Sequence, residues 1–424
     1  DDTIEIDGYG TLKLDDDFKV YKTYGVVKEQ KKRDVLVGYD LGKFVVAGKK
    51  VCAALLNHDF SATNIRVLIM NDDYSSLFHT KVVLQSDSTM HVTWGESEET
   101  LSPGTKLSVS PGDDRLKEGR MTITLEDPQK EIRILSTKRA QGTPSYFGSF
   151  ELSEESDGLL LINELDVEDY LTRVVPSEMP SNYELEALKA QAIAAHSYAL
   201  YCRDHAAEPA SGWLSVDPVR RQGYLTDAVL RSYWGTAYEE NYARLSALVD
   251  SVLTDVLYYG SAPAGTSYFA ISNGMTEASE NVWGTALPYL VAVDSSTDLN
   301  ADNYLYTVQF TTEQMQQALA GLGLLPDLAA PASWFGEAAL TPSGYVASLP
   351  ICGQSVTGPA LRKALGLRSA CFTVQYQEGS FLLTTKGYGH GVGLSQWGAK
   401  ALAEQGQSAE EILAHYFPGT ELRR

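Results

Sequence analysis

The sequence predicts an α+β protein in which a β-rich N-terminal part precedes a core of mixed helices and strands. Residues 106–110 and 120–126 alternate polar and apolar side chains, which is the period of a strand with one buried face. Residues 185–195 are instead rich in Ala and Leu, which are strong helix formers, and no Gly or Pro interrupts the helical pattern until Pro209.

Short strands are expected through about the first 140 residues, because turn signals rich in Pro and Gly divide this part of the chain. These signals stand at 102–104, 110–113 and 142–144. The charged run from Lys28 to Asp34 is typical of a solvated loop or of the end of a hairpin.

Helices are expected from the middle of the chain onward. A helix capped by Asp166 is expected over 166–175. A capping-box pattern at 181–184 is expected to open the Ala-rich helix. This second helix should be buried, because its small side chains leave little polar surface. Ser395 and the pattern Ser408–Glu411 cap two later helices. The remaining helices are expected at 238–253, 312–319, 359–365, 395–404 and 408–416, the strands at 256–259 and 268–271, and a loop or insertion at 329–346.

The charge balance limits the partners of this chain. Its 424 residues carry 34 Lys and Arg against 55 Asp and Glu, a formal net charge of −21. Such a field repels nucleic acids and anionic membrane surfaces. Neutral or cationic partners are favoured, and a neutral sugar polymer is one of them.

Cysteine and histidine give no metal site in this sequence. Cys202 and His205 lie three residues apart, but no third ligand is in register with them. Cys352 and Cys371 are close enough in sequence for a disulfide, which the sequence leaves open. No apolar run approaches the roughly 18 residues of a membrane span. The chain begins at Asp1 without an initiator Met, which is compatible with the removal of a secretory segment.

Glu178 is the first candidate functional residue. It stands between Pro176 and Pro180, just before the Ala-rich helix, so we expect the prolines to fix the direction of its side chain. Apolar neighbours would raise the pKa of its carboxyl group, as a general acid near neutral pH requires. The alternative is that Glu178 only caps helix amides.

A glycine-rich run surrounds one histidine, His390. Glycine at alternate positions lets the backbone turn sharply or approach a ligand. The run is neither a phosphate loop nor a dinucleotide fingerprint. The alternative is a buried histidine whose hydrogen bonds are satisfied between tight turns.

The third candidate segment is 272–277, followed by Trp283. Small polar residues after a strand, and then an aromatic ring, are typical of a sugar-binding groove. A turn followed by a core Trp is the alternative.

Taken together, these segments resemble the SpoIID/LytB family of bacterial cell-wall proteins. The resemblance covers roughly residues 64–424, with a β-rich part expected at 64–160 and a mixed core at 161–424, whereas residues 1–63 are expected to form a small β subdomain. The matching segments are Ser-Glu-Met-Pro at 177–180, Ala-Leu-Lys-Ala-Gln at 187–191, the glycine-framed histidine run at 389–399 and His-Tyr-Phe-Pro-Gly-Thr at 415–420.

The resemblance implies a lytic transglycosylase acting on peptidoglycan stripped of its stem peptides, with Glu178 as the catalytic acid and base and no cofactor. Most glycoside hydrolases need two carboxylates. A lytic transglycosylase needs one, because the C6 hydroxyl of the muramic sugar is the internal nucleophile. The residues expected to line or support the groove are Ser272, Asn273, Glu277, Trp283, His390, Ser395 and Gln396.

Three departures from the family pattern bear on this expectation. Sporulation-type members have a Cys and His zinc site, but the matching stretch 213–224 contains neither residue, so zinc is not expected here. His196 stands where the family often has Arg, and Met275 where an aromatic residue is common.

The rival expectation is a non-catalytic module of the LytB kind, which would hold glycan in the same groove and enhance a separate cell-wall amidase. In both cases the expected partner is the peptidoglycan glycan strand, not nucleic acid. In both cases the expected location is the cell envelope, outside the cytoplasm.

Overall fold

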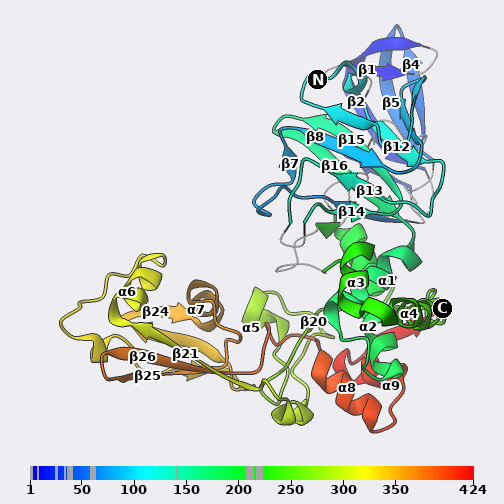
Figure 1. Ribbon diagram of the computed structural model, residues 1–424. Helices are drawn as coiled ribbons and strands as arrows, with labels where there is room; N and C mark the ends of the chain where they lie inside the picture. Colours follow the sequence, from blue (N-terminus) through cyan, green and yellow to red (C-terminus); the bar gives the residue numbers. More distant parts are fainter. Residues whose placement is uncertain are drawn as a thin grey trace. The chain divides into compact units, whose positions relative to one another are not determined.

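The computed structural model describes residues 3–6, 9–23, 27–32, 35, 42–57, 64–117, 119–139, 142–206, 214–215 and 223–424. It confirms the predicted α+β class with a β-rich N-terminal part (Figure 1). The chain divides into two compact units, Asp1–Arg173 with Cys202–Tyr238, and Val174–Tyr201 with Glu239–Arg424. The subdomain boundary predicted after residue 63 adjoins residues outside the described part and stays a prediction. No described helix is long and apolar enough to cross a membrane.

The first unit begins with a five-stranded sheet that has little core of its own. Its buried apolar side chains among the described residues are Val20, Val51 and Ala54. The start of the charged run that was predicted as a solvated loop or hairpin end forms an exposed strand, while Arg33 and Asp34 lie outside the described residues. The strand order is β1 (Thr3–Ile6), β2 (Gly10–Lys22), β5 (Lys50–Leu56) and β4 (Gly42–Ala47), with β3 (Lys28–Gln30) paired to β2.

Two further sheets of the first unit confirm the alternating segments. β11 (Lys106–Val109) buries Leu107 and Val109, and β12 (Met121–Leu125) buries Met121 and Ile123, which is the alternation that their sequences predict. The larger sheet runs β10 (Ser97–Leu101), β9 (Met90–Trp94), β12, β15 (Ser149–Glu155), β16 (Gly158–Leu165), β6 (Ile65–Leu68) and β17 (Leu214–Ser215), with β7 (Phe78–His79) on β16. The smaller runs β11, β8 (Val82–Ser86), β13 (Ile132–Ile134) and β14 (Ser145–Tyr146). Among the described residues, the helical elements that lie wholly within this unit include α3 (Asp227–Trp234) and the 3-10 turns Asp114–Leu116 and Gly235–Ala237.

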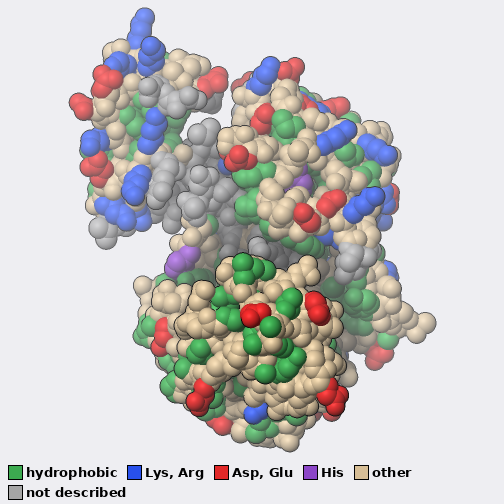
Figure 2. Space-filling view, turned by 90° about the vertical axis from the view of Figure 1, so that its left-hand side faces the viewer, with side chains coloured by type: hydrophobic (Ala, Val, Ile, Leu, Met, Phe, Trp, Pro, Cys, Tyr) green, Lys and Arg blue, Asp and Glu red, His purple; other side chains and the backbone are tan. Residues whose placement is uncertain are grey.

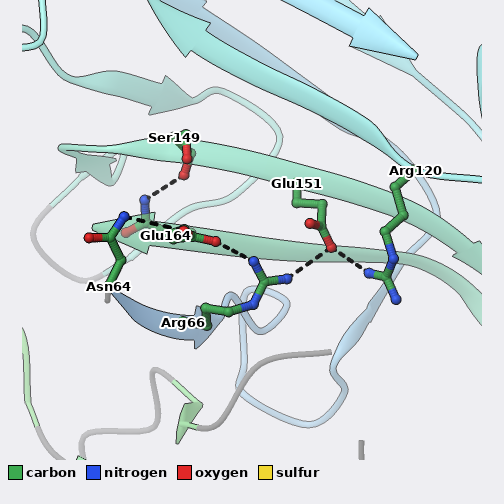
Figure 3. A network of polar contacts seen from close by, with 7 residues as sticks. Asn64, Arg66, Arg120, Ser149, Glu151 and Glu164 are labelled. Atoms are coloured by element: carbon green, nitrogen blue, oxygen red, sulfur yellow. Dashed lines mark hydrogen bonds and ion pairs between the residues drawn. The ribbon is translucent and has the colours of Figure 1, made fainter. Parts of the chain in front are cut away.

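A buried arginine ties the central strands of the larger sheet together (Figure 3). Arg66 on β6 is 2% exposed, and its guanidinium forms ion pairs with Glu164 on β16 and, at 3.0 Å, with Glu151 on β15. Arg120 pairs with Glu151 from the other side, and Asn64 donates to Glu164 at 3.2 Å. Because a buried charge is costly unless it is paired, removal of one member would leave its partner's charge buried without a counterion.

The two helices that lead into the second unit differ from the predictions, the first at its end and the second at its start. α1 (Val167–Glu178) is longer than predicted and contains Pro176 in its last turn, although Asp166 caps it through the amide of Asp169, at 2.7 Å, as expected. The predicted capping box at 181–184 is wrong, because α2 (Leu185–His205) begins after it and Tyr183 closes a turn onto Pro180 instead. α2 is buried along most of its length, as predicted.

The C-terminal helices of the second unit confirm their caps. Ser395 caps α8 (Gln396–Glu404), and Ser408 and Glu411 form a complete capping box at α9 (Ala409–Tyr416). Around them lie α4 (Tyr238–Asp250), α5 (Ser279–Trp283), the 3-10 turn Ser296–Asn300, the sheet β19 (Ala262–Pro263), β18 (Val256–Tyr259), β28 (Glu421–Arg423), and the parallel pair β20 (Tyr268–Phe269) and β27 (Leu394–Ser395).

Residues 305–386 of the second unit have an apolar core of their own, which includes Trp334, Phe381 and Leu383. The stretch 329–346, predicted as a loop or insertion, therefore contributes to packing, because its Trp334 is only 2% exposed. The elements of this segment are β21 (Leu305–Thr311), β26 (Ser380–Lys386), β25 (Phe372–Gln377), β22 (Ala339–Leu340), β23 (Val346–Ile351), β24 (Gln354–Thr357), α6 (Thr312–Ala320), α7 (Gly358–Leu365) and the 3-10 turn Pro331–Ser333. Cys352 and Cys371 are free thiols, so the disulfide left open by the sequence is not formed.

Candidate active site

Glu178 is the last residue of α1. The helix predicted to end at Val175 continues through Pro176 to Glu178, so Glu178 belongs to a helix end and does not stand between two proline-fixed turns. The residues around Glu178 anchor the helix end: Val174 and Val175 are fully buried, and the amide of Met179 still donates to the Val175 carbonyl at 2.9 Å. The direction of the Glu178 side chain is therefore set by a packed helix end, and Glu178 as a residue is partly exposed.

A glutamine from the far end of the chain contacts this carboxyl group. Nε2 of Gln396 lies 3.4 Å from Oε2 of Glu178 and 3.3 Å from Oε1 of Gln191 on α2. Gln191 is fully buried, and its own Nε2 has no hydrogen-bond partner among the described residues. Because Gln396 opens α8 directly after its cap Ser395, three helices converge at the carboxyl group.

A cavity of about 300 Å³ opens beside Glu178. Glu178 supplies the carboxyl group and Arg368 the cation among the described side chains that line it. Three rings, those of Tyr183, Tyr388 and Trp397, give the cavity aromatic walls of the kind that pack on the C–H faces of sugars. The other lining residues are Pro180, Ala270, Ile271, Asn303 and Gln396.

Two predicted groove residues, Ser272 and Ser395, lie in a buried network behind the cavity. Both are fully buried, and both bind Oδ2 of Asp298: the Ser272 amide at 2.6 Å and the Ser395 hydroxyl at 2.7 Å. Burial raises the pKa of Asp298, and these hydrogen bonds act in the opposite direction. The two serines thus hold the start of α8 and do not face the cavity.

Glu277 and Asn273 connect the segment 272–277 to a neighbouring loop. Glu277 is 1% exposed, and its carboxylate accepts hydrogen bonds from Asn281, at 2.8 Å, and from Thr341, at 2.5 Å. The side-chain amide of Asn273 donates to the carbonyl of Ser343 at 2.8 Å. Both side chains are engaged within the protein, so their placement is that of supporting residues.

His390 lies apart from the Glu178 cavity. It lines a second, smaller hollow of about 20 Å³ together with Glu277 and Arg362. Its ring packs against Phe269 and Trp283, with centroids 5.6 Å and 5.2 Å away. Nδ1 accepts a hydrogen bond from the Val392 amide at 3.1 Å, and burial lowers the pKa of His390 to about 4. The histidine is therefore neutral at physiological pH.

The glycines around His390 permit close backbone approach, as predicted. Gly393 has φ 83°, and a Cβ there would lie 2.1 Å from the Ser267 carbonyl oxygen. The amide after it, that of Leu394, donates to this carbonyl at 3.0 Å. As a result, Tyr388 and Gln396 line the Glu178 cavity, whereas His390 lines the smaller hollow.

Of the predicted site residues, the structure therefore brings Gln396 to Glu178 and gathers Glu277, Trp283 and His390 elsewhere. Sequence reasoning missed five residues at the Glu178 site. Gln191 and Trp397 stand inside the quoted motifs and Tyr388 stands directly before one, so these three could have been found there, whereas nothing in the pattern singled out Tyr183 or Arg368.

The predicted lack of a zinc site concerns a stretch that is mostly outside the described residues, since 213 and 216–222 are not among them. Within the described part of the chain, no group of three or more His, Cys, Asp or Glu side chains could hold a metal ion.

Over 263 residues, the sequence is 37% identical to stage II sporulation protein D of Bacillus amyloliquefaciens. The matched region covers 62% of this chain and 75% of that protein. The chain belongs to the stage II sporulation protein D family. The protein of the same name from Bacillus subtilis (strain 168) is 36% identical over the same length. A family model described as "Stage II sporulation protein" matches residues 155–259, which include Glu178 and Gln191. The resemblance inferred from the motifs is thus confirmed.

A second kind of relative matches more weakly. The amidase enhancer of Bacillus subtilis (strain 168) is 28% identical over 310 residues, which cover 59% of this chain and 40% of that protein.

Proposed function

We propose that this stage II sporulation protein D family member cleaves the glycan strand of peptidoglycan as a lytic transglycosylase. The observation that carries the proposal is the pairing of one carboxyl group, Glu178, with aromatic walls around a cavity of about 300 Å³. Most glycosidases that use water place a second carboxylate across the scissile bond. The described lining of this cavity contains no second carboxyl group, which favours a reaction whose nucleophile belongs to the substrate.

In this mechanism Glu178 acts first as an acid and then as a base. The protonated carboxyl group gives its proton to the glycosidic oxygen as the bond from C1 of muramic acid to that oxygen breaks. The C6 hydroxyl of the same sugar then attacks C1, and its proton returns to the carboxylate of Glu178. The products are a 1,6-anhydro end and a new hydroxyl end, with no water consumed.

Gln396 and Gln191 would hold the carboxyl group in position for both steps. The Gln396 amide approaches Oε2 of Glu178 and is itself held by Oε1 of Gln191. A positioned acid needs its geometry fixed to within a fraction of an ångström, so an amide anchored on a buried side chain suits this role.

The test is the release of 1,6-anhydro products from glycan strands freed of peptides. Glu178→Gln should lower the rate by about 100- to 10,000-fold, because a general acid and base is lost while the side chain keeps its shape. Glu184→Gln, an exposed change six residues away, should cleave at the wild-type rate. Equal product from wild type and Glu178→Gln would refute the mechanism.

The likeness to an amidase enhancer favours one alternative, a glycan-binding module that stimulates a separate amidase. The same cavity would then hold glycan without cleaving it. Binding of glycan with no anhydro product, together with faster peptide release by an added cell-wall amidase, would support this alternative. Either function requires a location at the cell envelope, outside the cytoplasm.

A further inference from the structure

Arg368 lines the Glu178 cavity and stacks on aromatic rings. Its guanidinium carbon lies 3.8 Å from the centre of the Tyr306 ring and 5.3 Å from that of Tyr388. Its backbone is also fixed, because its carbonyl accepts hydrogen bonds from the Gly389 amide at 2.8 Å and from Nε of Arg362 at 3.2 Å. Ring stacking and the backbone hydrogen bonds thus hold the guanidinium of Arg368 in place at the cavity.

No described side chain neutralises this cation. Among the described residues, the Arg368 guanidinium makes no hydrogen bond or ion pair, whereas Lys189, Lys400 and Arg423 of the same unit each pair with a glutamate. A guanidinium stacked on a ring keeps its N–H edge available for two parallel hydrogen bonds to a carboxylate.

The surrounding charge makes an available cation unusual. The second unit, residues 174–201 and 239–424, contains 20 Asp and Glu against nine Lys and Arg. In Figure 2 the body that carries α6, in the lower part of the view, shows few Lys and Arg side chains. An anionic group on a ligand would be repelled by this unit as a whole, so it needs a local cation to be accepted.

We propose that Arg368 binds the free carboxylate of the lactyl group on muramic acid and thereby selects glycan strands that have lost their stem peptides. This inference rests on the proposed function of the cavity. In a strand that still carries peptides, the same carboxyl group is an amide and has no charge. Arg368 is thus a specificity-determining residue, separate from the acid that breaks the bond.

The test compares binding of three glycan probes to the Glu178→Gln protein, in which cleavage is suppressed. The probes are strands freed of peptides, the same strands with the lactyl carboxylates coupled to methylamine, and strands that carry peptides. We expect binding to the free carboxylate to be about 10- to 100-fold tighter than to the methylamide, as for a charge-assisted pair.

Adding Arg368→Gln should bring the affinities for these first two probes to the same value, near that for the methylamide. Arg368→Lys keeps the charge but not the planar fork, so it should keep part of the preference. Lys363→Gln removes an exposed positive charge from α7 and should keep the full preference. Thermal melting of each variant checks that the fold is intact.

Two outcomes would overturn the role of Arg368. One is a preference for the free carboxylate that survives Arg368→Gln or is absent from the parent. The other is tightest binding of strands that carry peptides, lost on Arg368→Gln, which would assign the cation to a stem-peptide carboxylate. Because binding is measured without cleavage, a protein that keeps the expected preference but forms no anhydro product supports Arg368 and refutes only the lytic reaction.

Discussion

At the scale of single residues, the protonation of His390 links the stability of the fold to pH. Its Nδ1 accepts the Val392 amide, so the proton of the neutral ring is on Nε2. A backbone hydrogen bond to Tyr268 favours the charged form, but burial and the nearby Arg362 outweigh it and lower the pKa to about 4. Protonation would therefore place a charge in a site built for a neutral ring.

This pKa predicts how stability depends on pH. An unfolded histidine has a pKa of about 6.5, so between about pH 4 and pH 6.5 the unfolded chain binds a proton that the folded chain does not. The contribution of His390 to the free energy of unfolding is then fully present above about pH 6.5 and is lost as the pH falls toward 4. His390→Gln should show a smaller loss than wild type when urea unfolding at pH 7 is compared with pH 4.5.

The control is Gln354→Asn on β24, an exposed change that removes no titrating group, which should lose as much stability as wild type over the same range. If His390→Gln also loses as much as wild type, His390 does not titrate in the way its burial indicates.

At the scale of elements, the contact between α8 and α9 sets where Gln396 lies. Gly398 stands in the first turn of α8, and a Cβ on it would lie 1.9 Å from the Tyr416 hydroxyl and 2.7 Å from the Ser295 hydroxyl. Those two hydroxyls are hydrogen-bonded to each other at 2.8 Å. The absence of a side chain at residue 398 therefore lets the helix that carries Gln396 pack closely on its neighbours.

Gly398→Ala should lower the free energy of unfolding by about 1–3 kcal/mol, because the added methyl group overpacks this contact. In a Tyr416→Phe background the nearest clashing atom is gone, so the same substitution should cost less. Urea unfolding of the two single variants and the double variant measures the coupling. Equal costs in both backgrounds would show that the Tyr416 hydroxyl is not the obstacle.

At the scale of the whole molecule, the chain folds as two compact units. It passes from one unit to the other within α1 and again within α2, so each of these helices contains residues of both units. The Arg66 network lies within the first unit, and the apolar core around Leu383 lies within the second. We expect two unfolding transitions in calorimetry, because each unit has buried residues of its own.

Arg66→Met should lower the transition of the first unit, with a loss of about 3–5 kcal/mol, because it leaves Glu151 and Glu164 without their buried cation. Leu383→Ala should lower the other transition by about 2–5 kcal/mol, because it opens a cavity in the core. A single transition that moves with either substitution would mean that the two units unfold together.

The sequence by itself determined those features whose causes are local. Alternation predicted β11 and β12, Ala and Leu predicted the buried α2, and side-chain caps predicted the starts of α8 and α9. The Ser-Glu-Met-Pro and glycine-framed motifs identified the family, because motifs are read from the sequence alone. Pro176 misled the boundary of α1, since a proline in a last helical turn is tolerated when the helix end is packed.

Only the tertiary structure decided what surrounds Glu178. Gln396 lies 218 residues further along the chain, and Arg368 has no local pattern to mark it. His390, although it shares the glycine-rich run with Gln396, lines a different hollow. Periodicity and caps record contacts within a few residues, whereas a cavity forms where distant elements pack, and that packing depends on the whole set of buried side chains.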